Sequence, residues 1–92
     1  MKAIWKGTVI AESDDTVIVE GDHYFPAAAV KQQYLLTSNT RRMSGKGEAT
    51  FFTLFVDGDA HPDGAWTHAD PKEEVAAIRG RIAFGRGVQV VP

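Results

Sequence analysis

The chain contains no cysteine among its 92 residues. Without a thiol it can form no disulfide, it has no thiolate nucleophile, and it cannot build the cysteine zinc sites of many small domains. Disulfides are typical of secreted proteins and rare in the cytosol, so the absence of cysteine fits a cytoplasmic protein.

Long hydrophobic runs and an excess of positive charge are also missing. No apolar run approaches the roughly 18 residues that suggest a membrane span, and the first residues lack the apolar core and cleavage site of a signal peptide. The net charge is −2, whereas a nucleic-acid-binding surface is basic. We therefore expect no membrane partner and no nucleic-acid partner.

Motifs that would indicate catalysis are scarce. The stretch Gly45–Gly47 places a lysine between glycines, but a phosphate-binding loop needs a helix directly after it, and here Glu48 and Ala49 open a predicted strand. The serines lie in polar turns without the surroundings of a nucleophilic serine. These patterns favour a protein without catalytic activity of its own, and they leave the question open.

The three histidines also lack the spacing of metal ligands. They are His23, His61 and His68. Only His61 and Asp63 stand two residues apart, as two ligands on one strand face would. We interpret the histidines as surface or hydrogen-bonded side chains, and we predict no metal and no cofactor.

The sequence pattern is organised around residues 47–71, which hold three of the five phenylalanines. Residues 49–56, ATFFTLFV, are predicted as a strand with two apolar faces, so we expect it inside a sheet and covered on both sides. The Asp-Gly pair at 57–58 is typical of a two-residue hairpin turn. Pro62 has no N–H to donate and interrupts the returning strand.

Shorter strands are predicted on both sides of this hairpin. They cover residues 3–5, 8–11, 16–20 and 88–91, and residues 81–84 are predicted as a strand or a connector. Residues 37–47 are rich in Ser, Thr, Asn and Gly, and they are predicted as a long loop.

Two helices are predicted. Pro26 can open the first, because its fixed φ suits a first helical position, and residues 27–35 continue it. The second has Asp70 as its N-cap, a proline next, Glu73 to complete a capping box, and Gly80 to end it. The chain is thus predicted as one domain, residues 1–92, of mainly β (α+β) class. We expect a small, mostly antiparallel sheet with two short helices.

A candidate binding site follows from the predicted hairpin. Trp66 and His68 are two residues apart and share one face of a strand. Tyr24 lies beside the start of the first helix, and Arg42 and Lys46 lie on the polar stretch that leads into the hairpin. An aromatic wall with a cationic rim suits a small anionic or planar ligand. The alternative is a core tryptophan beside a solvated basic loop.

Several short motifs, in order, resemble one bacterial family, known as domain of unknown function 427. They are Trp5–Ser13, Val19–Gly21, Tyr24–Pro26, Lys46-Gly47, Asp63–Trp66, Pro71 and Phe84–Val90. The resemblance covers nearly the whole chain. It implies a compact, mainly β fold of the β-tent type, similar to the ligand-binding domain of cereblon and to methionine sulfoxide reductase B. Those relatives often hold zinc through four cysteines, which this chain lacks. The family carries a nucleotidyltransferase-like label at times, and no residue here supports that label.

The chain departs from the family pattern at three places. Met43–Gly45 stands where the family commonly has Cys-Pro-aromatic, and Thr67–Ala69 stands where two tyrosines and a proline are usual. Gly85 replaces a frequent tryptophan. A family site built on those residues would be altered or lost in this member. The matching site positions that the chain keeps are Tyr24, Lys46 and Trp66.

Three functions remain open on this basis. The first is a small-molecule-binding module without chemistry of its own. The second is an enzyme acting on a nucleotide or another phosphorylated ligand, and the third is a structural or partner-binding domain, as a monomer or a dimer. The absence of a convergent acid–base or nucleophile set favours the first and the third.

Overall fold

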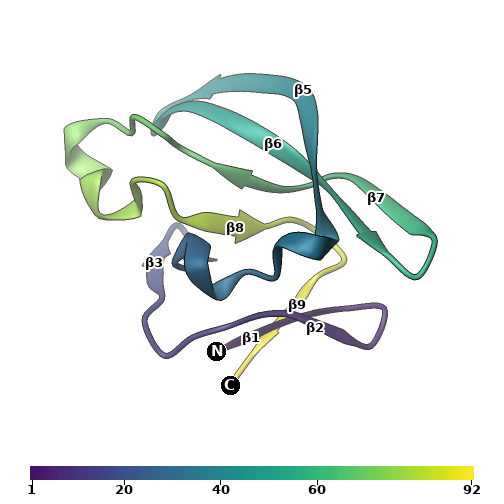
Figure 1. The fold of residues 1–92 in the computed structure, drawn as a ribbon. Coiled ribbons are helices and arrows are strands. Elements are labelled where there is room, and N and C mark those ends of the chain that lie inside the picture. The colour runs from purple at the N-terminus through teal and green to yellow at the C-terminus, as the bar shows by residue number, and fades with distance from the viewer.

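The computed structural model describes residues 1–92 and consists of three antiparallel sheets, with strand orders β2-β1-β9, β3-β4 and β5-β6-β7-β8 (Figure 1). The strands are β1 (Lys2–Trp5), β2 (Thr8–Glu12), β3 (Val17–Val19), β4 (Asp22–Tyr24), β5 (Leu35–Ser44), β6 (Gly47–Val56), β7 (Asp59–Thr67), β8 (Ile82–Phe84) and β9 (Gln89–Val91). The helical elements are η1 (Ala27–Ala29), η2 (Gln32–Tyr34) and η3 (Glu73–Ile78). The predicted mainly β, mostly antiparallel fold is confirmed.

The two ends of the chain meet in the three-stranded sheet β2-β1-β9. β9 pairs with β1, with Val91 opposite Lys2, so the two termini lie side by side in Figure 1. The amino group of Met1 donates a hydrogen bond to the carbonyl of Ser13 at 2.9 Å. The four-stranded sheet lies above this pair of termini in the same view.

Three hairpins turn on two-residue loops in which both residues have positive φ. These loops are Lys6-Gly7 (54° and 73°), Glu20-Gly21 (53° and 85°) and Asp57-Gly58 (50° and 85°). Positive φ at both central positions is what a type I′ turn requires, and its twist matches that of antiparallel strands. The turn predicted at 57–58 is therefore confirmed.

The predicted loop at residues 37–47 is wrong. Most of it belongs to β5, a ten-residue strand that pairs with β6 from Leu35 to Ser44. Only Gly45 and Lys46 form the turn between the strands. β5 is an edge strand, where polar side chains are exposed. Its backbone hydrogen bonds come from β6, the next strand along the chain, and the polar composition of residues 37–44 does not reveal this pairing.

The central strand β6 lies inside its sheet, as predicted, but neither of its faces is buried along the whole strand. Leu54 and Val56 face the core and are almost fully buried. Phe55 on the opposite face is 41% exposed. The expectation that both faces are covered is therefore wrong at the Phe55 end, whereas Ala49, on the same face as Phe55, is only 5% exposed.

The first predicted helix is replaced by the two single 3₁₀ turns η1 and η2. Between them Val30 forms an isolated bridge with Ala11 of β2, and the amide of Lys31 donates to the carbonyl of Ile10 at 2.9 Å. These hydrogen bonds to a strand replace those that would continue a helix. Pairing with a distant segment has overridden the local helix propensity.

The second predicted helix is a kinked 3₁₀ element, η3, with non-helical backbone angles at Val75. Its N-cap is Lys72, without a side-chain cap, so the predicted capping box is wrong. The Asp70 side chain is 93% exposed and pairs with Arg79 at 3.2 Å instead. Gly80 has a φ of 69°, so the predicted left-handed glycine beyond the helix is confirmed.

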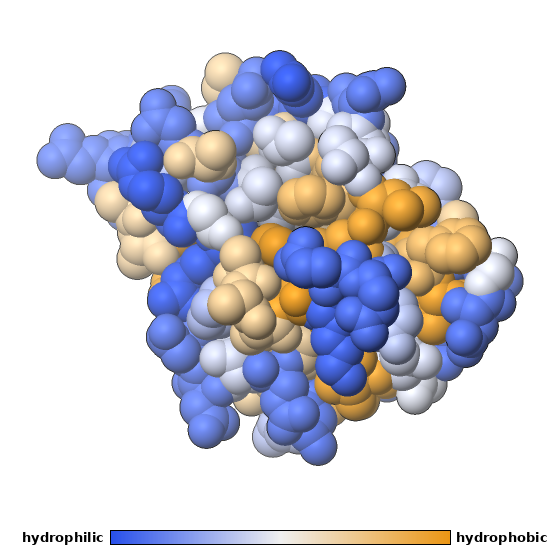
Figure 2. All heavy atoms as spheres, viewed as in Figure 1, coloured by the Kyte–Doolittle hydropathy of each residue, from blue (hydrophilic) through white to orange (hydrophobic).

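The buried side chains form two clusters. The larger one joins the sheets and comprises Ala3, Ile10, Ala11, Phe25, Val30, Leu54, Val56, Ala65, Ile82 and Phe84. The smaller one comprises Tyr24, Ile78 and Ala83 and supports Trp66 from inside. On the face seen in Figure 2, apolar surface gathers near the middle and is bordered by strongly polar side chains.

A bulge in β7 sets the direction of the strand that carries Trp66. Phe52 pairs with Ala65 and Leu54 pairs with His61, so three residues of β7, 62–64, lie opposite the single residue Thr53. The bulge accommodates Pro62 without breaking the ladder.

Gly64 in this bulge is expected to be sterically required. A Cβ added there would lie 2.9 Å from Cγ of His61 and 3.1 Å from its backbone oxygen. We expect Gly64→Ala to lower the free energy of unfolding by about 1–3 kcal/mol, as overpacking does. Gly45→Ala is the matched control, because nothing lies within 4 Å of its added Cβ. Equal urea midpoints for the two variants would show that His61 moves aside freely.

Candidate functional site

A hollow of about 260 Å³ opens where the β5–β6 turn meets the end of β7. It is lined by Arg42, Met43, Ser44, Lys46, Ala49, Phe51, Trp66 and His68. Four of the five residues proposed from the sequence therefore line one hollow. The fifth, Tyr24, lies beneath it and is fully buried.

Trp66 forms the wall of the hollow. It stands opposite Phe51 of β6, with ring centroids 6.1 Å apart, and opposite Ala83 of β8 on its other side. Its Nε1–H donates a hydrogen bond to the hydroxyl of Tyr24 at 3.2 Å. A half-buried indole thus has its one polar atom satisfied and its orientation held. Tyr24 positions the wall and does not line the hollow.

His68 is the most deeply buried polar side chain of the site, with 2% of its surface exposed. Its Nδ1 lies 3.2 Å from the carbonyl of Glu48, which can only accept, so Nδ1 carries the proton. Burial lowers the pKa of His68 below its ordinary value, which favours the neutral ring. In that form Nε2 is a free acceptor.

The Nε2 atom of His68 has no hydrogen-bond partner within the protein. It takes part in none of the side-chain hydrogen bonds of the structure, where His68 bonds only through Nδ1. No buried side-chain nitrogen or oxygen lacks a partner, so Nε2 is not sealed in the interior. Since His68 lines the hollow, Nε2 is its one ring nitrogen that remains for a ligand there.

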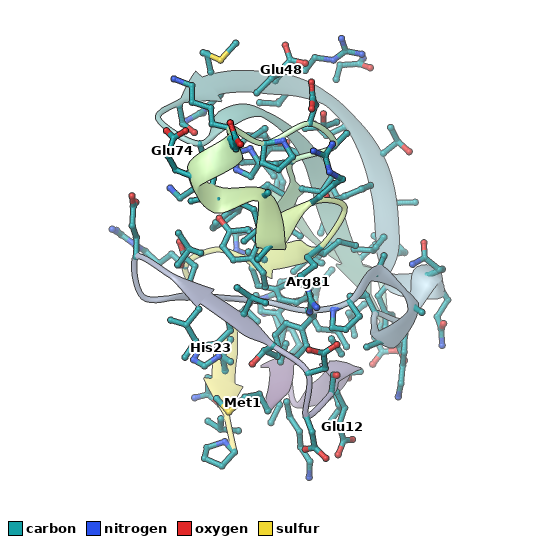
Figure 3. The ribbon with its side chains drawn as sticks, turned by 90° about the vertical axis from the view of Figure 1, so that its left-hand side faces the viewer. Met1, Glu12, His23, Glu48, Glu74 and Arg81 are labelled. Carbon is teal, nitrogen blue, oxygen red and sulfur yellow. The ribbon has the colours of Figure 1, made fainter.

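The segment after β7 is held over the β5–β6 turn by backbone hydrogen bonds. The amide of Lys72 donates to the carbonyl of Lys46 at 2.9 Å, and the amide of Gly80 donates to the carbonyl of His68 at 3.0 Å. Gly47 has a φ of 111°, and an added Cβ would lie 3.2 Å from the carbonyl oxygen of Asp70. Glycine therefore allows the close approach that brings His68 to the hollow. Figure 3 shows Glu48 and Glu74 of η3 at this end of the molecule.

Two cations border the hollow. Lys46 Nζ lies 2.9 Å from Glu20, and this hydrogen bond is the main cause that raises the pKa of Lys46. Its side chain is only 17% exposed. Arg42 is exposed, and its guanidinium lies 5.6 Å from the ring centroid of Phe51, within cation–π range. The rim is therefore positively charged, although Glu20 partly compensates the charge of Lys46.

The remaining polar groups show no further clustering. No group of three or more His, Cys, Asp or Glu side chains is close enough to hold a metal ion. His23 bonds with Thr16, and His61 donates from Nε2 to the carbonyl of Arg86 at 2.6 Å.

No helix is both long and apolar enough to cross a membrane.

A second, larger hollow of about 690 Å³ shares Trp66 with the first. It is lined by Gly21, Asp22, His23, Trp66, Phe84, Gly85, Arg86, Val88 and Val90. Sequence reasoning missed it, because its walls come from β4, from β7 and from the β8–β9 connection. The Gly85–Gly87 turn was visible in the sequence, but only the pairing of β8 with β7 brings it to Trp66.

The comparison with family models decides the relationship of the chain to known proteins. The model of the family described as Domain of unknown function (DUF427) matches residues 1–91. The chain belongs to this family. The family resemblance drawn from the short motifs is thereby confirmed. Among curated proteins, none matches the chain.

The protonation state of His68 can be measured directly. We expect the NMR titration midpoint of its imidazole to lie below 6.5, because burial disfavours the charged ring. The spectrum of His68→Gln assigns the signal. A midpoint at or above 6.5 would contradict the neutral form.

The same shift predicts how stability depends on pH. A depressed folded-state pKa means that the unfolded chain binds the proton more tightly, so the contribution of His68 is fully present above pH 6.5. It declines as the pH falls from there through the pKa of the folded state. Urea unfolding from pH 8 to pH 5 should therefore show a steeper loss for the parent than for His68→Gln.

The Tyr24 hydroxyl is expected to stabilise the tryptophan wall. Tyr24→Phe removes the acceptor of the indole N–H, so we expect a loss of about 1 kcal/mol in the free energy of unfolding. Tyr34→Phe is the control, since Tyr34 is partly buried and its hydroxyl makes no hydrogen bond within the protein. Equal losses in the two variants would remove Tyr24 from the positioning role.

Proposed function

We propose that this chain is a small-molecule-binding module, without catalytic activity of its own, that holds a small anionic ligand with a planar ring. The site is the hollow between the β5–β6 turn and the end of β7. The observation that supports it is the meeting, in one hollow, of an aromatic wall, a free imidazole acceptor and two cations. The site residues are Arg42, Lys46, Trp66 and His68, with Tyr24 as a positioning residue.

The size of the hollow limits the ligand. Its volume of about 260 Å³ lies just below the range of roughly 300–1,000 Å³ that is usual for ligand sites. A single-ring compound fits that volume better than a nucleotide does. The faces of Trp66 and Phe51 suit a flat ring.

The polar groups limit the ligand further. Lys46 and Arg42 favour a carboxylate or a phosphate at the rim. His68 Nε2 accepts a hydrogen bond, so a ligand with an N–H or O–H on its ring is favoured over one without. The two cations and the imidazole acceptor together favour a single-ring aromatic acid that carries an N–H or O–H donor on its ring.

A thermal-shift screen tests the proposal. Hydroxybenzoates, pyrrole carboxylates and benzoate form the aromatic arm, and nucleotides form a second arm. A ligand at a hundredfold excess over its dissociation constant stabilises the folded state by about 2.7 kcal/mol, which raises Tm by roughly 10 °C or more in a domain of this size. We expect aromatic acids with a ring donor to raise Tm more than benzoate.

Two variants separate the charge of Lys46 from its ion pair. Lys46→Gln removes the cation and should abolish the shift. Glu20→Gln removes only the ion-pair partner, so binding of an anion should be kept or strengthened. If both variants behave alike, Lys46 does not contact the ligand.

Trp66→Phe tests the wall. On a Trp5→Phe background, the remaining indole reports the ligand by its fluorescence. Trp66→Phe removes the hydrogen bond to Tyr24 in either role, so both roles predict a loss of stability. Only a pocket role predicts that Trp66→Phe also weakens the Tm shift caused by the ligand. Turnover of a nucleotide that raises Tm would favour the enzyme alternative, and a complete absence of shifts would favour a structural or partner-binding domain. A cytoplasmic location and the oligomeric state, monomer or dimer, stay predictions.

A further inference from the structure

The larger hollow lies on the side of Trp66 where the β3–β4 hairpin meets the β8–β9 connection. Its volume of about 690 Å³ is within the usual range of ligand sites. In Figure 3, His23 of β4 lies next to β9, which marks this side of the molecule. The hollow is therefore distinct from the one beside the β5–β6 turn, although the two share an indole.

Two opposite charges line this hollow without pairing. Asp22 comes from β4, and Arg86 comes from the turn after β8. The ion pairs of the structure are Lys46–Glu20, Arg79–Asp70 and Arg81–Asp15. Asp22 and Arg86 belong to none of them, so both remain available to a ligand.

The backbone holds both charged residues in place. The Arg86 carbonyl accepts a hydrogen bond of 2.6 Å from His61, and the preceding residue, Gly85, donates its amide to the carbonyl of Gly64 at 2.8 Å. Asp22 directly follows a tight turn and pairs with Val19. Backbone hydrogen bonds thus fix the positions of both Asp22 and Arg86 beside their turns.

The surroundings of Asp22 favour a positively charged partner. Burial is the main cause that raises the pKa of its carboxyl group, and Glu20 raises it further, while Lys46 and His23 lower it. Arg86, the other charged group of the hollow, bears the opposite sign and is exposed. A cation placed at Asp22 would offset the cost of its burial.

Apart from Gly21, His23 and Gly85, the rest of the lining is apolar. This apolar wall is formed by Trp66, Phe84, Val88 and Val90. A Cβ on Gly85 would come within 3.5 Å of Cζ3 of Trp66, so glycine leaves this edge of the indole uncovered. An apolar group of a ligand would find its contact surface here.

We propose that this second hollow binds a free α-amino acid with a large apolar side chain. Its ammonium group would pair with Asp22, its carboxylate with Arg86, and its side chain would rest on the apolar wall. A ligand with a positive charge, a negative charge and an apolar group can contact Asp22, Arg86 and the apolar wall at once. A simple anion would leave Asp22 unpaired, and a simple cation would leave Arg86 unpaired.

Isothermal titration calorimetry with L-leucine and L-phenylalanine tests the assignment. N-acetyl-L-phenylalanine lacks the ammonium group, and L-phenylalaninamide lacks the carboxylate. We expect the free amino acids to bind and each blocked form to bind about tenfold or more weakly. No heat from either free amino acid at millimolar concentration would overturn the proposal, as would equal binding of the blocked forms.

Charge-removing variants locate the binding. Asp22→Asn and Arg86→Gln should each lower the affinity about tenfold or more. Asp59→Asn and Arg41→Gln remove the same charges from exposed positions outside the hollow and should leave it unchanged. Should Asp22→Asn fail to fold, Arg86→Gln still decides, because its side chain is exposed. Unchanged affinity in Arg86→Gln would overturn the assignment.

The two hollows can be told apart in the same experiment. Arg42→Gln should leave amino-acid binding unchanged, because Arg42 lines only the smaller hollow and is not among the charges that act on Asp22. If it abolishes amino-acid binding, the ligand occupies the smaller hollow, and the proposal for the larger one is wrong. The failure of either proposal thus leaves the other standing.

Discussion

The pairing register between β6 and β7 is the constraint on which the rest of the structure depends. It places Phe51 opposite Trp66 on the outer face, while Leu54 and Phe52 face the core. A slip of one residue would turn Trp66 to the other face of the sheet. The Asp-Gly turn sets the register at one end of the hairpin. The bulge at residues 62–64 shifts it by two positions, which preserves the alternation of faces.

Trp66 links the interior to both hollows. Its indole N–H is held by Tyr24, which belongs to the smaller buried cluster with Ile78 and Ala83. The ring then forms a wall of both hollows. A change in the packing around Tyr24 would therefore move the indole wall of both hollows. Tyr24 and Trp66 together form the structural centre of the candidate sites.

The candidate site could be predicted in part because strand periodicity is a local property. Trp66 and His68 stand two residues apart, and both line the smaller hollow. Lys46 precedes the strand that pairs with theirs, so the hairpin brings it to the same end. Tyr24 was placed near the site by sequence, yet its role under the wall depends on contacts 42 residues apart in the chain. The acceptor at His68 Nε2 depends on a hydrogen bond to Glu48, which no local pattern shows.

The sequence by itself determined the β class, the hairpin at Asp57-Gly58 and the family, because turn chemistry, strand propensity and short motifs are written in neighbouring residues. Only the tertiary structure decided that residues 37–44 are a strand, and that the segment after Pro26 forms turns. In both places the backbone gains its hydrogen bonds from another strand. Residues 37–44 pair with β6, the next strand along the chain, and the segment after Pro26 bonds with β2, which lies earlier in the chain. It also decided that Asp22 and Arg86 share a hollow, since 64 positions of chain separate them and only the packing of β4 against β8 closes that distance.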